Sequence, residues 1–288
     1  MTPEILHVAS ADGATAELIV HPSARDEFLY WLPALGVTAR HYARFAELMA
    51  TAGIGLARHE WRGAGSSNLR ARRGVDWRYR DLLADVAQGL AALRAQHPAA
   101  RIWIGGHSLG AQLAALTLAR DSSIAGLALV AGGIPHWRRF PRWQWPLMLG
   151  LVAGFPTLAA VCGYFPGQRI GFAGREAKSL MRDWASTAWS GRYRQVLDDG
   201  DLDAELANLA HPLLALQLRD DRYAPPSSLS GLLAKLPRSR AQTQSLAPAD
   251  FGHGRADHFS WMKDPQPVVQ RIAQFVLAHG TDPAPLPS

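Results

Sequence analysis

Cysteine and lysine are both scarce in this sequence of 288 residues. Its single cysteine, Cys162, excludes an intrachain disulfide and a cysteine-based zinc site, so we expect any covalent catalysis to use another nucleophile. Lysine occurs only as Lys178, Lys235 and Lys263, and most of the positive charge comes from scattered arginines. The formal net charge of +6 permits attraction to anionic partners, but no run of five basic residues and no nucleic-acid motif is present. We therefore expect no binding to nucleic acid.

The N-terminal segment lacks the features of a secretory signal. Its first ten residues, M-T-P-E-I-L-H-V-A-S, contain neither a basic start nor an apolar run, and we expect a cytoplasmic protein. Hydrophobic residues make up 48% of the chain and charged residues 19%, which is typical of a globular protein with one large core. The last nine residues, 280–288, are rich in proline and are expected to form a disordered tail.

Short apolar runs alternate with amphipathic stretches along most of the chain, which is typical of an α/β fold. The apolar runs predict strands at 4–9, 14–20, 28–33, 54–59, 101–105, 124–131, 213–219 and 240–246. The amphipathic stretches predict helices at 39–52, 78–96, 109–120, 226–235 and 266–279. We expect the first two strands to form a hairpin and the others to run parallel.

Residues 134–210 break this alternation, because five tryptophans stand there among prolines and arginines. We expect an insertion, termed the cap, between two parts of the core, 1–133 and 211–279. Within the insertion, residues 146–165 carry no charge and are nominally long enough to cross a bilayer. Pro156 near the centre and several glycines favour a broken helical pair that lines an apolar cavity.

The stretch before this apolar segment is W-R-R-F-P-R-W, residues 137–143. Aromatic rings and arginines both suit the depth of a membrane interface, so we expect a weak contact with a membrane surface through the cap. Ordinary packing and solvation explain the same residues equally well, and that alternative stays open.

The motif with most chemical content is G-H-S-L-G, residues 106–110, between an apolar strand and an amphipathic helix. This is the context of a nucleophile elbow, in which a sharp turn presents a serine hydroxyl beside a helix N-terminus. The flanking glycines permit the turn. We therefore predict that Ser108 is a catalytic nucleophile, and that the backbone amide of Leu109 donates to the oxyanion of the transition state.

A serine nucleophile needs a carboxylate and a histidine, which follow it in the order serine, acid, histidine. Two carboxylates, Asp220 and Asp221, stand on the loop after a late strand, and either is a candidate. For the base we predict His258, since the apolar residues that follow it and a terminal helix fix its loop. His253 is the alternative. We expect no metal site, because the spacing of the nearby histidines and aspartates matches no standard metal motif.

The second oxyanion donor is expected on an early loop. The stretch F-L-Y-W-L-P-A-L-G-V leaves a strand and enters a helix, and the amide of Leu35 lies where this donor is expected.

Several motifs stand in one order along the chain: P-A-L-G-V at 33–37, R-G-A-G-S at 62–66, the elbow at 106–110, and the acid and base loops. With these motifs the chain resembles the α/β-hydrolase superfamily, in particular bacterial predicted hydrolases related to serine aminopeptidases and monoglyceride lipases. The G-Y-F-P-G stretch at 163–167 is similar to that group.

The resemblance implies an α/β-hydrolase fold, a mostly parallel sheet flanked by helices, with a helical cap. It favours Asp221 over Asp220, because the spacing D-x-x-A-P resembles the acid loop of this fold. Many relatives carry His-Gly in the oxyanion loop, where this chain has Pro33-Ala34, so the position of Leu35 is the least constrained. Arg62 is expected to tie loops together, without a catalytic role.

These inferences together predict a serine hydrolase that cleaves a carboxylic ester of a lipophilic or aromatic acid and needs no cofactor. Its partner would be a small-molecule acyl substrate. A thioesterase, an amidase or peptidase, and an acyltransferase would use the same triad, and a non-catalytic member would bind a ligand through the cap. The sequence does not give the oligomeric state.

Overall fold

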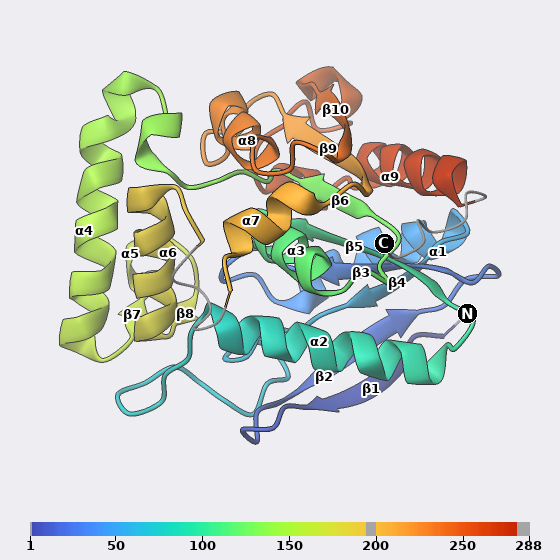
Figure 1. Ribbon diagram of the computed structural model, residues 1–288, viewed down its shortest axis with the longest axis horizontal. Coiled ribbons are helices and arrows are strands. Elements are labelled where there is room, and N and C mark those ends of the chain that lie inside the picture. The colour runs from blue at the N-terminus through green and yellow to red at the C-terminus, as the bar shows by residue number, and fades with distance from the viewer. Residues whose placement is uncertain (1, 194–199, 281–288) are drawn as a thin grey trace.

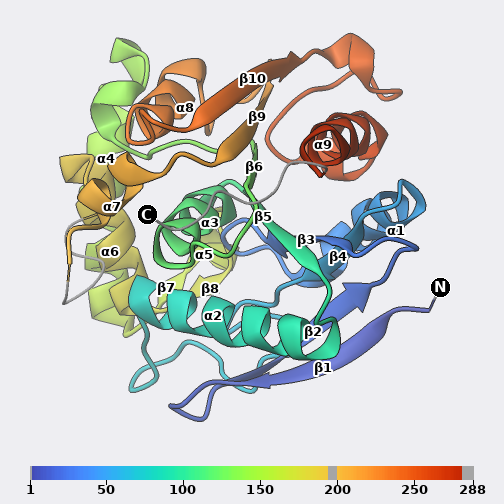
Figure 2. The ribbon, with the colours of Figure 1, turned by 45° about the vertical axis from the view of Figure 1, so that its right-hand side comes forward.

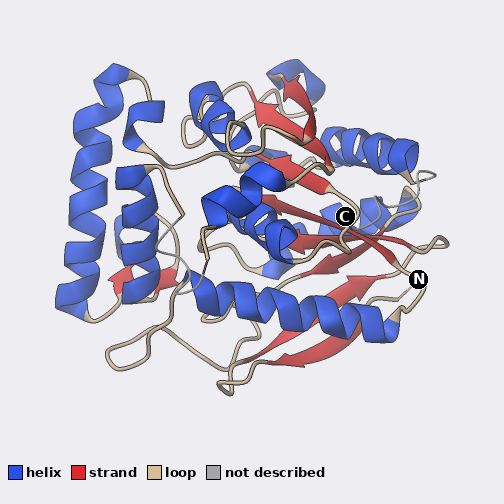
Figure 3. Ribbon diagram, viewed as in Figure 1, coloured by secondary structure: helices blue, strands red, loops and turns tan. Residues whose placement is uncertain are grey.

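The computed structural model describes residues 2–193 and 200–280. Most of its strands form an eight-stranded sheet in the order β1-β2-β4-β3-β5-β6-β9-β10, and β7 and β8, described below, form a separate antiparallel pair (Figures 1 and 3). The strands of the sheet are β1 (Glu4–Ala9), β2 (Thr15–His21), β3 (Glu27–Leu32), β4 (Gly55–Arg58), β5 (Arg101–His107), β6 (Leu127–Val130), β9 (Pro212–Leu218) and β10 (Arg240–Leu246). β1 and β2 form an antiparallel hairpin, β2 also pairs antiparallel with β4, and every other neighbouring pair in this sheet is parallel. The predicted α/β fold with a mostly parallel sheet is confirmed.

Helices cover both faces of this sheet (Figure 2). They are α1 (Ala43–Thr51), α2 (Tyr79–Gln96), α3 (Leu109–Arg120), α8 (Pro226–Leu233) and α9 (Gln266–His279), and a 3₁₀ turn (Ala39–Tyr42) precedes α1. One apolar core lies between the sheet and α2 with α3, and a second lies between the sheet and α1 with α9.

The alternation of side chains along β3 shows how one strand serves both cores. Tyr30 and Leu32 belong to the core under α2 and α3, whereas Leu29 and Trp31 belong to the core under α1 and α9. Successive side chains of a strand point to opposite faces, so a strand covered on both faces is apolar throughout. This is why the sequence shows continuous apolar runs for the central strands.

The segment between β6 and β9 contains several further elements. They are 3₁₀ turns at Trp137–Arg139 and Arg142–Gln144, then α4 (Trp145–Cys162), β7 (Phe165–Pro166), α5 (Gly167–Ile170), β8 (Arg175–Glu176), α6 (Lys178–Ser190) and α7 (Leu202–Asn208). α4 and α6 lie side by side at one end of the molecule (Figures 1 and 3). The division into a core of 1–133 and 211–279 and a cap of 134–210 stays a prediction. The predicted tail at 280–288 lies outside the described residues except for Gly280.

The expectation of a broken helical pair in the apolar segment is wrong, because α4 is one helix with Pro156 inside it. Proline inside a helix removes one backbone donor and its ring crowds the carbonyl group four residues earlier, at a cost of about 3 kcal/mol. The buried residues Met148, Val152, Phe155 and Ala159 follow a spacing of four, three and four, so a continuous helix buries all of them on one face. That shared burial outweighs the local cost of the proline.

Candidate active site

Ser108 stands at the turn between β5 and α3, in a backbone conformation that few residues adopt. Its φ angle is 56°, in the left-handed region, and its ψ angle is −114°. Gly106 and Gly110 make the turn possible, because chain segments pass very close to both. A Cβ atom at Gly106 would lie 2.3 Å from the carbonyl carbon of Gly110, and one at Gly110 would lie 2.1 Å from the Leu32 oxygen. The local sequence thus fixes a strained turn that presents the hydroxyl.

The serine, the histidine and one of the two aspartates predicted from sequence come together by hydrogen bonds. The Oγ atom of Ser108 lies 2.8 Å from Nε2 of His258, and Nδ1 of His258 lies 2.8 Å from Oδ2 of Asp221. A carboxylate can only accept, so Nδ1 of His258 donates its proton to Asp221 and Nε2 can accept from the hydroxyl of Ser108. Ser108, His258 and Asp221 come from three loops that follow β5, β10 and β9 in the fold.

Asp221 is held rigidly in this arrangement. Its side chain is fully buried, and its second oxygen accepts hydrogen bonds from the amides of Tyr223 and Ala224 at 2.8 and 2.9 Å. A carboxylate that is fixed by two amides has little freedom to turn away from the imidazole. The loop therefore sets the orientation of His258.

Asp220 and His253, the alternative acid and base, form hydrogen bonds within the loops that carry Asp221 and His258. Asp220 is exposed, and its carboxylate accepts from the amide of Ala256 at 3.2 Å, which ties the acid loop to the loop of His258. His253 lies against Phe251 with the rings stacked 5.6 Å apart, and its Nε2 atom lies 3.1 Å from the Ser260 carbonyl oxygen. Neither residue contacts Ser108.

The two predicted oxyanion donors line the same cavity as Ser108. Within the described chain, the amides of Leu35 and Leu109 donate no hydrogen bond, so both remain available to a ligand. The loop of Leu35 is pressed against the segment between β6 and β9, since a Cβ atom at Gly36 would lie 2.1 Å from the Gly174 nitrogen. Their role as donors stays a prediction.

A buried tyrosine joins the loop of Leu35 to the turn of Ser108. The hydroxyl of Tyr42 accepts from the Ala34 amide at 3.0 Å and lies 2.8 Å from Nδ1 of His107. Burial holds the pKa of His107 well below its usual range, so this imidazole is neutral. The ring of His107 lies 4.9 Å from that of His258 and thus fills the space behind the proposed base.

The cavity beside Ser108 has a volume of about 670 Å³. Its walls are mostly apolar and come from the elbow, from the acid and base loops and from α4 and its neighbours. The side chains from the segment between β6 and β9 include Phe140, Trp143, Leu147, Met148, Leu151, Phe155, Ile170, Phe172 and Trp184. The expectation that the apolar segment lines an apolar cavity is therefore confirmed.

A second cavity of about 440 Å³ shares Leu35 and Leu109 with the first. Glu176 lines it, and its Oε1 atom accepts from the Gly174 amide at 3.1 Å. Burial raises the pKa of this carboxyl to about 7. The second cavity thus contains an acid that can be neutral near neutral pH.

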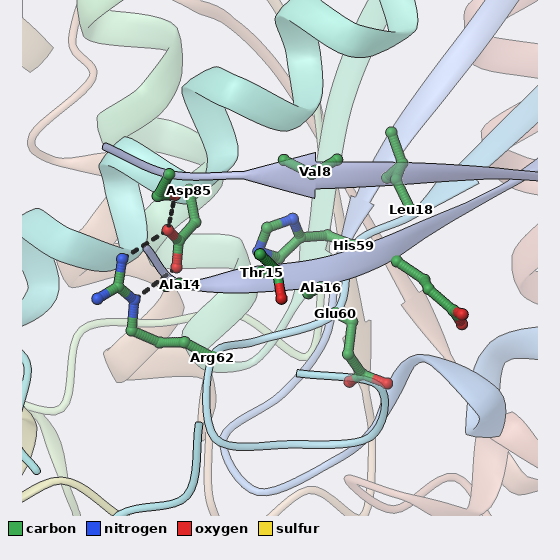
Figure 4. A pocket seen from close by; sticks show the side chains of 11 residues that line it. Val8, Ala14, Thr15, Ala16, Leu18, His59, Glu60, Arg62 and Asp85 are labelled. Atoms are coloured by element: carbon green, nitrogen blue, oxygen red, sulfur yellow. Dashed lines mark hydrogen bonds and ion pairs between the residues drawn. The ribbon is translucent and has the colours of Figure 1, made fainter. Parts of the chain in front are cut away.

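Arg62 ties loops together, as predicted, and lines the second cavity but not the cavity of Ser108. Its guanidinium donates to both oxygens of Asp85 on α2, each at 2.6 Å, and to Asp12 in the β1–β2 turn at 2.7 Å. Ser10 also donates to Asp85. Figure 4 shows the contact between Arg62 and Asp85. The space among them is about 20 Å³, room for one water molecule, so this cluster is structural.

The sequence did not single out three residues of this site. Gln112 lines the main cavity one helical turn after Ser108, with its oxygen accepting from the Tyr193 hydroxyl at 3.0 Å. The i, i+4 spacing from the nucleophile was a signal for it. Tyr42 and His107 had no such signal, because their contact joins positions that are 65 residues apart. Within the described ranges, no group of three or more His, Cys, Asp or Glu is arranged to hold a metal.

Comparison with known proteins gives one family and many similar folds. A family model described as "Serine aminopeptidase, S33" (Hydrolase_4) matches residues 25–275. The comparison with curated proteins gives no match.

Several solved structures resemble the chain. The α/β hydrolase GrgF from Penicillium sp. sh18 has 15% identity and a TM-score of 0.64, over 97% of this chain and 99% of that one. The Pyrococcus furiosus esterase Pf2001 has 14% identity and a TM-score of 0.59, over 96% of this chain and 91% of that one. An esterase from Exiguobacterium antarcticum has 14% identity and a TM-score of 0.60, over 94% and 98%. At such identities the likeness shows the fold.

Proposed function

Because the chain belongs to the serine aminopeptidase S33 family of α/β hydrolases, we propose that it is a serine hydrolase that cleaves carboxylic esters with Ser108 as nucleophile. The observation that carries the proposal is the hydrogen-bonded chain from Ser108 through His258 to Asp221, at a strained turn that opens into a cavity. Two of the similar solved structures are esterases, which supports the choice of an ester substrate.

The geometry suggests a two-step reaction. His258 accepts the hydroxyl proton at Nε2 while Oγ of Ser108 attacks the ester carbonyl carbon, and the amides of Leu109 and Leu35 donate to the oxygen that becomes negative. When the tetrahedral intermediate collapses, the carbon–oxygen bond to the alcohol breaks and His258 returns the proton to the leaving alcohol. The acyl group stays on Ser108 as an ester. Asp221 stabilises the imidazolium in each step without taking its proton.

Water completes the cycle by the same route. His258 takes a proton from a water molecule, whose oxygen attacks the acyl-enzyme carbonyl. The bond to Oγ then breaks, the proton returns to Ser108, and the free carboxylic acid leaves. No other group is needed to balance these steps.

The main cavity supports a lipophilic acyl group. Trp184 and Phe155 from the segment between β6 and β9 line the cavity of Ser108, and most of the residues that line it are apolar. A volume of about 670 Å³ suits a chain or ring much larger than acetate. We therefore expect kcat/KM to rise as the acyl group lengthens from acetate.

Para-nitrophenyl esters of increasing chain length test this proposal. We expect the wild type to prefer a medium-length chain, and Ser108→Ala to lower kcat/KM by about a thousandfold or more. Equal rates for the two proteins would show that hydrolysis arises elsewhere. Thioester and amide analogues with the same acyl group distinguish an esterase from a thioesterase or an amidase, which would use the same three residues.

A further inference from the structure

Exposed large apolar side chains gather on one part of the molecule. Eight such side chains are found in the described residues, and all but Ile5 lie on the segment between β6 and β9 or at the main cavity. These seven are Trp143, Leu147, Val161, Ile170, Trp189, Tyr223 and Phe259. Trp143 is 74% exposed and Val161 is 70% exposed. A concentration of this kind marks an interaction surface.

The outer face of α4 carries no charged side chain. Its exposed positions include Ala153, Thr157 and Ala160, and the Thr157 hydroxyl donates to the Ala153 carbonyl oxygen at 2.7 Å instead of facing solvent alone. The stretch Arg142–Cys162 is long and apolar enough to span a membrane by length and composition, yet only 22% of its apolar window is buried. A helix whose outer face meets water normally carries polar side chains there. The apolar outer face of α4 is therefore suited to an apolar partner.

The stretch of chain that contains α4 carries charge of one sign. No acidic residue occurs between Asp121 and Glu176, whereas the same stretch contains Arg138, Arg139, Arg142, Arg169 and Arg175. The first three precede α4, are exposed, and form no ion pair with any residue that the structure describes. Such an apolar face, with arginines at its edge, is complementary to a partner that has an apolar interior and negatively charged groups at its boundary with water.

Tryptophan rings accompany the arginines. The guanidinium of Arg138 lies 4.8 Å from the ring centre of Trp137, and that of Arg142 lies 5.9 Å from the ring centre of Trp145. Paired aromatic rings and guanidinium groups are suited to the boundary between lipid headgroups and acyl chains.

We propose that the outer face of α4, with Trp143 and the arginines before it, docks onto the surface of an anionic lipid bilayer. α4 lies in the plane of the interface and does not cross it, because its other face packs against α6 and buries Met148, Val152 and Phe155. Trp143 and Leu147 are exposed and also line the main cavity, so the docked face adjoins the cavity mouth. A lipophilic ester would enter from the bilayer.

Vesicle sedimentation tests the docking. Purified protein is spun with vesicles of phosphatidylcholine alone and with vesicles that contain phosphatidylglycerol as well. We expect binding to the mixed vesicles and much weaker binding to phosphatidylcholine. Arg138→Gln/Arg142→Gln should lower the partition coefficient for mixed vesicles by roughly tenfold, because each arginine contributes electrostatic attraction to an anionic surface.

Two matched double variants distinguish the contribution of the α4 face to vesicle binding from the contribution of the protein's net charge. Ala153→Glu/Ala160→Glu places two carboxylates on the outer face of α4, and Ala84→Glu/Ala91→Glu places two at the same spacing on the exposed side of α2. Both variants add the same negative charge. We expect the α4 variant to lose at least about tenfold in partition coefficient and the α2 variant to lose far less.

Three outcomes would overturn the docking proposal. Wild-type protein that stays in the supernatant with mixed vesicles would contradict it, as would equal binding by the two double variants. So would a dimer in analytical ultracentrifugation that the α4 variant dissociates, without vesicle binding, since a second copy would then cover the face. Hydrolysis of a water-soluble para-nitrophenyl ester is measured in parallel, and its presence or absence judges the proposed function separately.

Discussion

At the scale of single residues, the site depends on a few side chains that are held by buried hydrogen bonds. Ser108, His258 and Asp221 form the central chain, and the Asp221 carboxylate is itself held by two amides. Tyr42 stands behind them, since its hydroxyl connects the Ala34 amide to His107. We expect Tyr42 to act as a positioning residue, because it contacts both the oxyanion loop and the residue before the nucleophile.

Tyr42→Phe tests this role. The change leaves the Ala34 amide and the His107 ring without their partner, so we expect a loss of about 1–3 kcal/mol in the free energy of unfolding. We also expect kcat for a para-nitrophenyl ester to fall by roughly tenfold. The Leu35 amide would be displaced, and a displaced oxyanion donor stabilises the transition state less well. Urea unfolding and steady-state kinetics measure the two effects.

Tyr30→Phe is the matched control. The hydroxyl of Tyr30 lies 2.9 Å from Nδ1 of buried His59, which is the same kind of bond outside the main cavity. We expect a similar loss of stability and an unchanged kcat. If Tyr42→Phe and Tyr30→Phe change kcat equally, Tyr42 contributes only to stability.

At the scale of elements, the parallel strands bring three loops to one end of the sheet, and the segment between β6 and β9 lies over them. Gly36 in the loop of Leu35 lies against Gly174 just before β8, so the two parts of the chain fit closely there. β8 also contains Glu176, whose buried carboxyl faces the second cavity. The stability of this contact should therefore depend on pH.

Glu176→Gln tests that dependence. The pKa of Glu176 is raised to about 7 from 4.5 by burial, so the folded protein keeps a proton that the unfolded chain has already lost between these values. Stability from this group is present below pH 4.5 and is lost as the pH rises through 7. Urea unfolding at pH 5 and pH 8 should show a decline in wild type that exceeds the decline in Glu176→Gln by up to about 3 kcal/mol. Parallel changes in the two proteins would rule out a buried neutral carboxyl.

At the scale of the whole molecule, the strands and helices outside the segment between β6 and β9 were predictable because their patterns are local. The β3 run Phe28 to Leu32 is apolar throughout, which predicts a strand covered on both faces, and the elbow is a contiguous motif. The loops of the acid and of His258 could be chosen from sequence, since each stands at the end of a strand or before a helix. The preference for Asp221 over Asp220 came from the resemblance of its D-x-x-A-P spacing to the acid loop of the family. The continuity of α4 through Pro156 could not be predicted from sequence, because it depends on packing against α6.

Contacts between loops that are distant in the sequence could not be predicted either. The Tyr42 hydroxyl meets His107 across 65 positions, and no periodicity records such a contact. The close approach of Gly36 to Gly174 likewise depends on how the segment between β6 and β9 returns to the sheet. These contacts determine how the site residues are positioned relative to one another, whereas the sequence motifs indicate only which residues belong to the site.

The most direct test of the proposed chemistry is labelling with a fluorophosphonate, followed by intact-mass measurement and peptide mapping. A serine activated by a histidine attacks the phosphorus, releases fluoride and becomes covalently modified. We predict one adduct, on Ser108, that is lost in His258→Ala and kept in His253→Ala. Folded wild-type protein that carries no adduct on Ser108, or His258→Ala protein labelled as fast as wild type, would contradict the account.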